Sequence, residues 1–303
     1  MTQLEGILAV HKPAGWTSHD VVAKVRGIVR LKRIGHTGTL DPEVTGVLPL
    51  CLGRATRVVE YLQELPKEYY AVLRLGYATD TEDITGNVIE TADEVNVTES
   101  EALAALQSFT GRISQVPPMF SAVKVNGKRL YELAREGKTV ERKSREVTIH
   151  EIEMTDFHPG DGYTDISFRV LCSKGTYIRT LCVDIGRKLD LPSVMVKLVR
   201  TVSAGITEEQ CLTLEQIEQF MKDESLHSRL IPVDQSIQYL PRHTVSEEKK
   251  DAALQGQRLS ARAVEPAVNS LEPIRLYDIN GNFLGIYKQQ EETGAIIPVK
   301  VFS

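Results

Sequence analysis

Apolar and polar residues alternate along the chain in two periods, and these periods predict most of its helices and strands. Residues 18–31 carry valine and isoleucine at helical spacing, which predicts an amphipathic helix with Ser18 as its N-cap. Residues 98–111 predict a second helix, because Thr98 and Glu101 form a capping box ahead of an alanine-rich run. The same spacing predicts two shorter helices, at residues 54–65 and 175–189.

Alternation with a period of two is typical of strands, and it marks four long stretches: residues 68–80, 146–157, 163–172 and 193–206. Residues 87–93 are a candidate hairpin partner for the first of these. A strong hairpin signal follows later in the chain, where apolar strands flank the Asn280–Gly281 dipeptide that a type I′ turn favours. Residues 295–302 then predict a closing strand.

The irregular order of these elements, with many hairpin-like joins, predicts the fold class. It favours an α+β fold, with a mixed, largely antiparallel sheet and packed helices, over a doubly wound parallel sheet. The polar stretch between Pro232 and Pro241 predicts a domain boundary. We therefore expect a large catalytic domain over residues 1–238 and a small β-barrel-like domain over residues 239–303.

Composition places the protein among ordinary globular chains, since 42% of its 303 residues are apolar and 25% are charged. No stretch approaches the ~20 apolar residues of a membrane span, and the N-terminal residues lack a signal-peptide pattern. We therefore expect a cytoplasmic protein with no membrane partner. Four scattered cysteines without a C-x-x-C pair predict free thiols, and the histidines show no zinc-binding spacing.

Charge is distributed unevenly, which matters more than the net charge of −5. Residues 1–57 hold 8 basic and 4 acidic side chains, whereas residues 58–123 hold 3 basic and 11 acidic ones. Residues 124–145, which include a predicted turn at Asn126–Gly127 and a helix ending at Arg135, hold 8 basic and 3 acidic ones. A solvated helix face would explain the last segment, but two basic segments that meet in space would also attract a nucleic acid.

Several familiar motifs are absent or incomplete. The acidic stretch 80–86 resembles a calcium loop, but loop positions six and twelve are Thr85 and Thr91 rather than Gly and Glu, so a turn is the better interpretation. There is no phosphate-loop motif and no G-x-S-x-G elbow, which disfavours a nucleotide hydrolase and a serine hydrolase. An aspartate-dependent phosphohydrolase would need a second carboxylate and metal ligands that the sequence does not offer.

The stretch "GHTGTLDPEVTGVLPL", residues 35–50, is the strongest candidate site. A single Asp before Pro, as at Asp41, usually begins a turn. Here Gly, His and Thr residues extend over a dozen positions, which exceeds the needs of one turn. A glycine-lined loop with a carboxylate and basic residues on both sides suits a site that receives a phosphate-bearing substrate.

Two further stretches carry candidate chemistry. In "SKGTYIRT", Tyr177 and Arg179 share a face only if the segment is extended, and a plain helix start is the simpler alternative. In "PKEYYAV", one of the tandem residues Tyr69 and Tyr70 is expected in the core, while the other could stack on an unpaired base.

Five blocks in order, "HKPAGWTS", "GHTGTLDP", "KEYYAVLRLG", "PPMFSAVKVNGKRLYELAREG" and "SKGTYIRTL", resemble the TruB family of bacterial tRNA pseudouridine-55 synthases. The resemblance extends from about Gly6 to Arg200, and the last segment looks like the small RNA-binding PUA domain of that family. One departure is Val44, where the family usually has Ala.

The resemblance implies a reaction and a partner. The N-glycosidic bond of uridine 55 in the T-arm of tRNA is cut, the base turns, and a C5–C1′ bond forms, without a cofactor or a metal. Base flipping, an isomerase activity and a monomer without a protein partner are implied as well. An RNA-binding or tRNA-folding protein with secondary catalysis is the alternative, and an intact set of Asp41, Tyr69 and Arg179 separates the two, because binding alone does not need it.

By the same resemblance, Asp41 is the essential carboxylate, acting either as a nucleophile or as the base that removes the 2′ proton. Arg179 pairs with it, and Tyr69 stacks on the target base and helps to remove the C5 proton. The remaining residues are expected to contact the substrate or to support the pocket: Lys12 and Tyr177 line or brace it, His36 occupies the place that the base vacates, and Gly38 and Thr39 belong to the substrate-binding loop.

Overall fold

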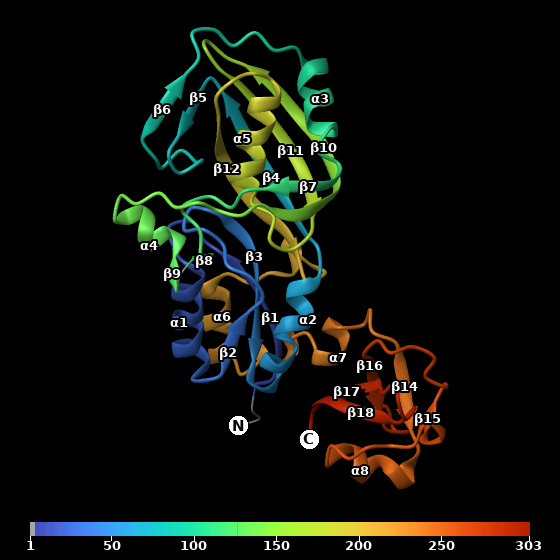
Figure 1. Ribbon diagram of the computed structural model, residues 1–303. Coiled ribbons are helices and arrows are strands. Elements are labelled where there is room, and N and C mark those ends of the chain that lie inside the picture. The colour runs from blue at the N-terminus through green and yellow to red at the C-terminus, as the bar shows by residue number, and fades with distance from the viewer. Residues whose placement is uncertain (1–3, 126) are drawn as a thin grey trace.

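A nine-stranded sheet forms the centre of the computed structural model, which describes residues 4–125 and 127–303 (Figure 1). From one edge to the other its strands are β1 (Gly6–Lys12), β3 (Thr45–Leu52), β12 (Ser193–Ser203), β4 (Lys67–Leu75), β11 (Thr164–Cys172), β10 (Arg145–Pro159) and β7 (Gly111–Gln115), with β2 (Ile34–His36) beside β3 and β13 (Ile206–Thr207) beside β12. All neighbours are antiparallel except β3 and β12, which confirms the predicted mixed, largely antiparallel α+β fold.

Helices cover this sheet in two groups. α3 (Glu99–Gln107) and α5 (Ile178–Lys188) pack on the half made by β4, β10 and β11, where Leu181 and Ile185 meet Leu73 and Phe168. α1 (Ser18–Val29) and α6 (Leu214–Lys222) pack on the half made by β1 and β3. The opposite face of that second half is covered by the short turns after β3 and by the segment around Val233, so β1 is buried on both faces.

The start of α1 differs from the prediction by one residue. Thr17 is the N-cap, since its hydroxyl accepts from the backbone N–H of Asp20 and the Asp20 carboxylate accepts in return. Ser18 is wholly buried instead, and its hydroxyl accepts a 2.9 Å hydrogen bond from the backbone N–H of Leu40. The prediction of Ser18 as the cap was therefore wrong, and its hydroxyl fixes the backbone next to Asp41.

The hairpin predicted between residues 68–80 and 87–93 forms only at its outer end. β6 (Val88–Thr91) pairs with β5 (Tyr77–Thr79), whereas β4 pairs with β11 and β12 in the main sheet. The break lies at Gly76, whose φ of 126° and close approach to the Gly162 carbonyl exclude a side chain. A separate small hairpin therefore stands beside the main sheet.

The acidic loop of this hairpin is a turn, as expected. The Asp83 carboxylate accepts from the Thr81 hydroxyl at 2.8 Å and from the Thr85 N–H at 2.9 Å. These bonds use the carboxylate for local structure, which is typical of Asx turns. No group of histidine, cysteine or acidic side chains in the described ranges is arranged to hold a metal ion.

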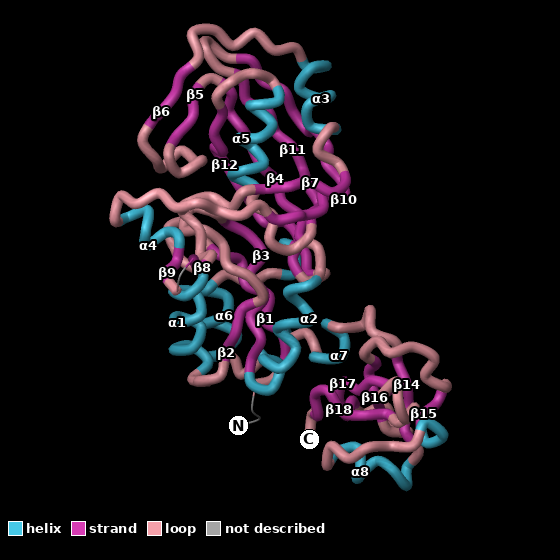
Figure 2. The backbone as a smooth tube through the Cα atoms, viewed as in Figure 1, coloured by secondary structure: helices cyan, strands magenta, loops and turns pink. Residues whose placement is uncertain are grey.

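A five-stranded sheet forms the last part of the chain, and Figure 2 shows it to one side of the nine-stranded sheet. Its strands, in spatial order, are β15 (Val264–Glu265), β14 (Arg242–Val245), β16 (Ile274–Tyr277), β17 (Phe283–Gln289) and β18 (Ile296–Val301). The hairpin predicted around Asn280–Gly281 joins β16 and β17, with Gly281 at a φ of 82°. The chain reaches this sheet through α7 (Val233–Ser236), inside the predicted boundary segment.

The two parts of the chain are in direct contact. Lys300 on β18 pairs with Glu60 at 2.8 Å, and the Arg54 guanidinium donates to the Ser303 carbonyl at 2.6 Å. Phe302 packs into the same apolar cluster as Ile237. The boundary segment is therefore packed between the two sheets rather than free in solution.

One buried carboxylate holds the turn between β16 and β17. Asp278 accepts from the backbone N–H of Asn280 and Asn282 and forms a 2.7 Å ion pair with Lys250. Burial alone would raise the pKa of Asp278, but the hydrogen bonds from Asn282 and Lys250 outweigh it and hold this pKa well below its ordinary value.

Asp278→Asn is expected to lower the free energy of unfolding by roughly 2 kcal/mol at neutral pH, because the buried acceptor of the Asn280 and Asn282 N–H groups loses its charge. Since the pKa of Asp278 is lower in the folded state, this stabilisation is complete above about pH 4 and disappears as the pH falls further. Urea unfolding of the wild type and the variant at neutral and acidic pH measures both effects. Asp251→Asn, which changes an exposed neighbour, is the control. A stability difference that is equal at both pH values would contradict this account.

Candidate active site

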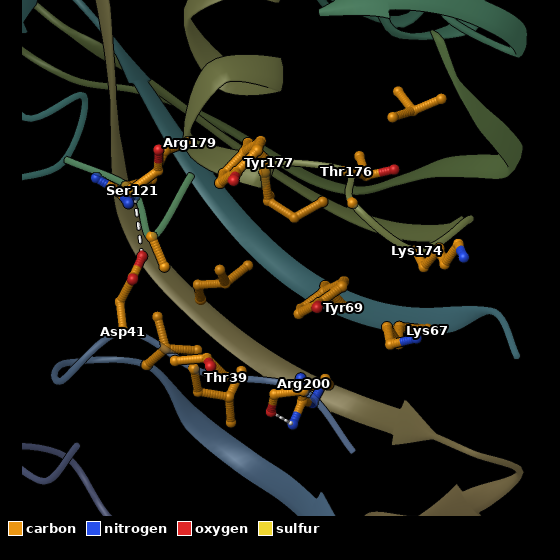
Figure 3. Close-up of a pocket in the computed structure, with 18 of the residues that line it drawn as sticks. Thr39, Asp41, Lys67, Tyr69, Ser121, Lys174, Thr176, Tyr177, Arg179 and Arg200 are labelled. Atoms are coloured by element: carbon orange, nitrogen blue, oxygen red, sulfur yellow. Dashed lines mark hydrogen bonds and ion pairs between the residues drawn. The ribbon is translucent and has the colours of Figure 1, made fainter. Parts of the chain in front are cut away.

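A cavity of about 610 Å³ opens over the main sheet where β12 and β4 lie side by side (Figure 3). Six separate parts of the chain line it, within residues 37–44, 63–69, 121–122, 145–147, 174–179 and 198–200. The loop with the strongest sequence signal and the "SKGTYIRT" segment are therefore brought together, although well over a hundred residues separate them.

An ion pair lies at one end of this cavity. The Arg179 Nε and the Asp41 Oδ2 are 3.0 Å apart, and Figure 3 shows this contact. The Arg179 side chain is only 6% exposed, whereas the Asp41 side chain is 45% exposed. The guanidinium is thus a fixed part of the wall, and the carboxylate it holds stays open to a ligand.

Arg179 is anchored by more than Asp41. Its Nη1 donates to the Thr81 carbonyl at 2.9 Å, and its Nη2 donates to the Phe120 carbonyl at 2.8 Å. These bonds join the acidic turn of the small hairpin and the segment before β8 (Lys124–Val125) to the candidate site. A planar guanidinium with five donors can hold three partners at once, which a lysine cannot do.

Lys12 holds the backbone that follows Asp41. The wholly buried Lys12 ammonium donates to the Pro42 carbonyl at 2.8 Å and also to the carbonyls of Pro13 and Trp16. Burial lowers the pKa of Lys12 to about 8, although the nearby carboxylates of Glu43 and Asp41 raise it. Lys12 does not line the cavity, so its position suits a brace for the loop rather than a contact with substrate.

Two tyrosines lie between the ends of the cavity (Figure 3). Tyr69 is buried on β4, and Tyr177 is the extended residue just before α5. The Gln115 side chain holds the backbone of Tyr177 by two hydrogen bonds, to its N–H and its carbonyl. Burial raises the pKa of the Tyr69 hydroxyl, and the charge of Arg200 opposes this effect. Tyr177 is extended but Arg179 lies in the first turn of α5, so the segment is a helix start, and both residues nevertheless line the cavity.

The remaining predicted residues lie along the loop. Gly38 and Thr39 line the cavity, whereas His36 does not, and its Nδ1 accepts from the Gly38 N–H at 3.2 Å. The His36 ring packs edge-on against His19 at 5.6 Å. Burial, His19 and Arg200 all lower the pKa of His36, which favours a neutral ring. The predicted role of His36 beside flipped RNA stays a prediction.

Four basic residues of the cavity had no place in the sequence-based site: Lys67, Arg145, Lys174 and Arg200. With Arg179 they give five cations against the two carboxylates of Asp41 and Glu146 among the residues that line the cavity. Arg145 lies in the basic segment 124–145 and Lys174 in "SKGTYIRT", whereas the only sequence signal of Lys67 and Arg200 is a charged residue at an inward-facing position of a strand. Such an excess of positive charge suits a polyanionic ligand.

Comparison with known proteins assigns the family. Residues 26–178 match the TruB family pseudouridylate synthase N-terminal domain, and residues 179–238 match the tRNA pseudouridylate synthase B C-terminal domain. The chain belongs to the TruB family of pseudouridylate synthases. As a TruB-family synthase it is an isomerase, which confirms the resemblance that the five sequence blocks indicated.

Relatives of this TruB-family chain match it along nearly its whole length. It is 46% identical over 303 residues to the tRNA pseudouridine synthase B of Bacillus anthracis, covering 98% of this chain and 97% of that protein. It is 42% identical over 305 residues to the enzyme of the same name from Bacillus pumilus (strain SAFR-032), covering 99% and 98%.

Solved structures agree with this assignment. A Cbf5–Nop10–Gar1 complex contains a chain that is 28% identical, with a TM-score of 0.76 over 99% of this chain and 84% of that one. An H/ACA RNP bound to a substrate RNA containing 2′-deoxyuridine contains one that is 25% identical, with a TM-score of 0.76 over 99% and 86%. No helix in the described part of the TruB-family chain is long and apolar enough to span a membrane.

Proposed function

We propose that the protein converts uridine 55 in the T loop of tRNA to pseudouridine. The observation that carries this proposal is the half-exposed Asp41 carboxylate, held by the buried Arg179 at one end of a cation-rich cavity. The names of the Bacillus relatives support tRNA as the substrate, and the resemblance to the family supports position 55.

A uridine in a folded RNA loop has to leave its stack to reach Asp41, at a cost of a few kcal/mol. The Tyr69 ring lies within the cavity and is placed to stack on the extruded base. His36 contacts the backbone of the cavity-lining Gly38, and the resemblance to the family supports its proposed role of occupying the vacated place in the RNA. Both contacts would offset part of the cost of extrusion.

Isomerisation then needs an ionised carboxylate beside the sugar. The N1–C1′ bond breaks with its electron pair on N1, the base turns, and C5 bonds to C1′. The C5 proton is lost and N1 gains one, so no atom is gained or lost overall. Asp41 acts either by adding to the sugar or by removing its 2′ proton, and Arg179 orients its carboxylate in both cases.

We further propose that residues 1–238 form the catalytic domain and residues 239–303 a PUA-like RNA-binding domain. The enzyme is proposed to act as a monomer in the cytoplasm, without a protein partner, on the T-arm alone. Light scattering of the purified protein, free and with tRNA, tests the monomer. A stable dimer in the active complex would contradict it.

The proposed function is tested by mapping pseudouridine in the tRNA of cells with and without this protein. Loss of the signal at position 55, restored by the wild type but not by Asp41→Asn, is the expected result. Tritium release from 5-tritiated uridine in purified tRNA provides the matching assay in solution. An unchanged position 55 in cells that lack the protein would overturn the proposal.

The basic segment 124–145 is expected to bind the phosphates of the same RNA. It includes β9 (Lys128–Arg129) and α4 (Leu130–Arg135), and Figure 1 shows α4 projecting at one side of the molecule (the predicted turn residue Asn126 lies outside the described residues). Lys124 and Lys143 are exposed and make no ion pair in the described part of the chain.

Replacing both Lys124 and Lys143 by Gln should weaken tRNA binding and reduce the slope of log affinity against log salt by about 1–2, because each phosphate contact contributes about 0.7–0.9. Filter binding over a range of salt concentrations measures the slope. Lys188→Gln, at the exposed end of α5, is the control and should leave it unchanged. An unaltered slope in the double variant would remove this segment from the RNA surface.

A further inference from the structure

Two cations lie on the floor of the cavity, on the face of the sheet that also carries Tyr69. Arg200 on β12 is 1% exposed and pairs across the sheet with Tyr69. Lys67 on β4 is 7% exposed and precedes Tyr69 by two residues, so its side chain points to the same face. All three line the cavity (Figure 3).

Among the residues that the structure describes, neither of these cations has an anionic partner. Arg200 donates to the carbonyls of Val47 at 2.8 Å and Gly38 at 3.1 Å, and Lys67 donates to those of Gln63 and Leu65, each at 2.8 Å. Within residues 4–125 and 127–303, no carboxylate oxygen lies within 4.0 Å of either charge.

The two side chains also converge on one point. A Cβ added to Gly38 would lie 3.5 Å from the Arg200 Nη1 and 3.8 Å from the Lys67 Cε. Two buried like charges without a counter-ion oppose folding, and such an arrangement is typical of sites that bind negative charge. The glycine leaves the space between them open.

The anion that fits this floor is the base rather than the RNA backbone. A phosphodiester is tied to the chain on both sides, and the cations placed for it are the exposed Lys174 and Arg145 at the rim. The floor lies beside Tyr69, where the proposed function puts the extruded base. When N1–C1′ breaks, the electron pair left on N1 spreads over the uracil carbonyl oxygens.

We propose that Arg200 and Lys67 bind the uracil carbonyl oxygen on which this negative charge develops, as the anion-stabilising residues of the glycosidic cleavage. The inference rests on the proposed function, because it needs a uracil that departs with its electron pair. In a pocket that excludes water, a fixed positive group that balances a developing negative charge lowers the energy barrier of the step in which that charge forms.

The decisive experiment compares uridine with 5-fluorouridine at the target position of tRNA, in single turnover at mildly acidic pH. Fluorine lowers the basicity of the departing uracil anion, so its departure depends less on stabilisation by the protein. Lys67→Met should slow conversion of uridine about 100-fold and that of 5-fluorouridine about 10-fold or less. The products are separated by chromatography of the digested RNA.

Lys174→Met is the matched control for this comparison. It removes a rim cation, so it should weaken binding and slow both substrates by the same factor. Equal losses on the two substrates for Lys67→Met would overturn the inference while leaving the proposed function intact. A wild type that converts neither substrate would overturn the proposed function itself.

A measurement on the wild type does not depend on the folding of any variant. Burial, followed by the charge of Arg200, lowers the pKa of Lys67 to about 8, while Cys172 and Glu64 raise it and Lys174 lowers it further. Lys67 is therefore charged below that pH and loses its charge as the pH rises through it. The single-turnover rate on uridine should fall above about pH 8, and a constant or rising rate there would overturn the inference.

Discussion

Asp41→Asn is expected to reduce isomerisation of tRNA by at least about 10⁴-fold, as removal of an essential catalytic group does in other enzymes. The substitution keeps the shape of the side chain and removes its charge. An amide can neither add to the sugar nor take up its 2′ proton, so both proposed roles of Asp41 fail together.

The fold and the affinity for tRNA should survive this change. Asp41 is half exposed, and its neighbours Leu40 and Pro42 are held through their backbone by Ser18 and Lys12. Binding relies on phosphate contacts elsewhere, so the dissociation constant should stay within several-fold of the wild type. Tritium release in single turnover and filter binding measure the two quantities.

Glu43→Gln is the control for Asp41→Asn. It also removes one negative charge, but from an exposed side chain that lies two residues further along the chain and does not line the cavity. It should retain the wild-type rate. Turnover by Asp41→Asn within tenfold of the wild type would refute the catalytic role.

Arg179→Lys should lower the single-turnover rate about 100-fold and affect the affinity for tRNA far less. An ammonium cannot reach Asp41, the Thr81 carbonyl and the Phe120 carbonyl together, so at least one buried carbonyl is left without a donor. The free energy of unfolding should therefore fall by about 1–3 kcal/mol.

Rate, affinity and urea unfolding are measured on the same preparation of Arg179→Lys. Arg187→Lys, an exposed position on the same helix, should leave all three unchanged. If Arg179→Lys lost rate and affinity in equal measure, the residue would serve binding rather than the orientation of Asp41.

Much of the fold can be predicted from the sequence, because periodicity and capping are local signals. The helix after Thr98 begins where its capping box predicts, and the hairpin around Gly281 forms as expected. Predictions fail where packing over long distances decides. A serine at the start of α1 looks like a cap, and only the nearness of Leu40 in space explains why Ser18 is buried instead.

The same distinction applies to the site. Asp41 and Arg179 lie in stretches with recognisable patterns, so the sequence was enough to propose them. From the sequence alone, Lys67 and Arg200 would be predicted to face solvent, because their burial depends on the pairing of β4 and β12. The contact of Arg179 with Thr81 leaves no trace in residue types, since its acceptor is a backbone carbonyl.

That last contact has a consequence for how the site tolerates change. Two of the groups that hold the Arg179 guanidinium are backbone carbonyls, so these two hydrogen bonds do not themselves depend on the side chains of residues 81 and 120. The path of the backbone there decides whether the two carbonyls reach the guanidinium, so an inserted or deleted residue would displace them and disturb the active centre. When either loop is transferred to another scaffold, its length should be preserved before its amino-acid sequence.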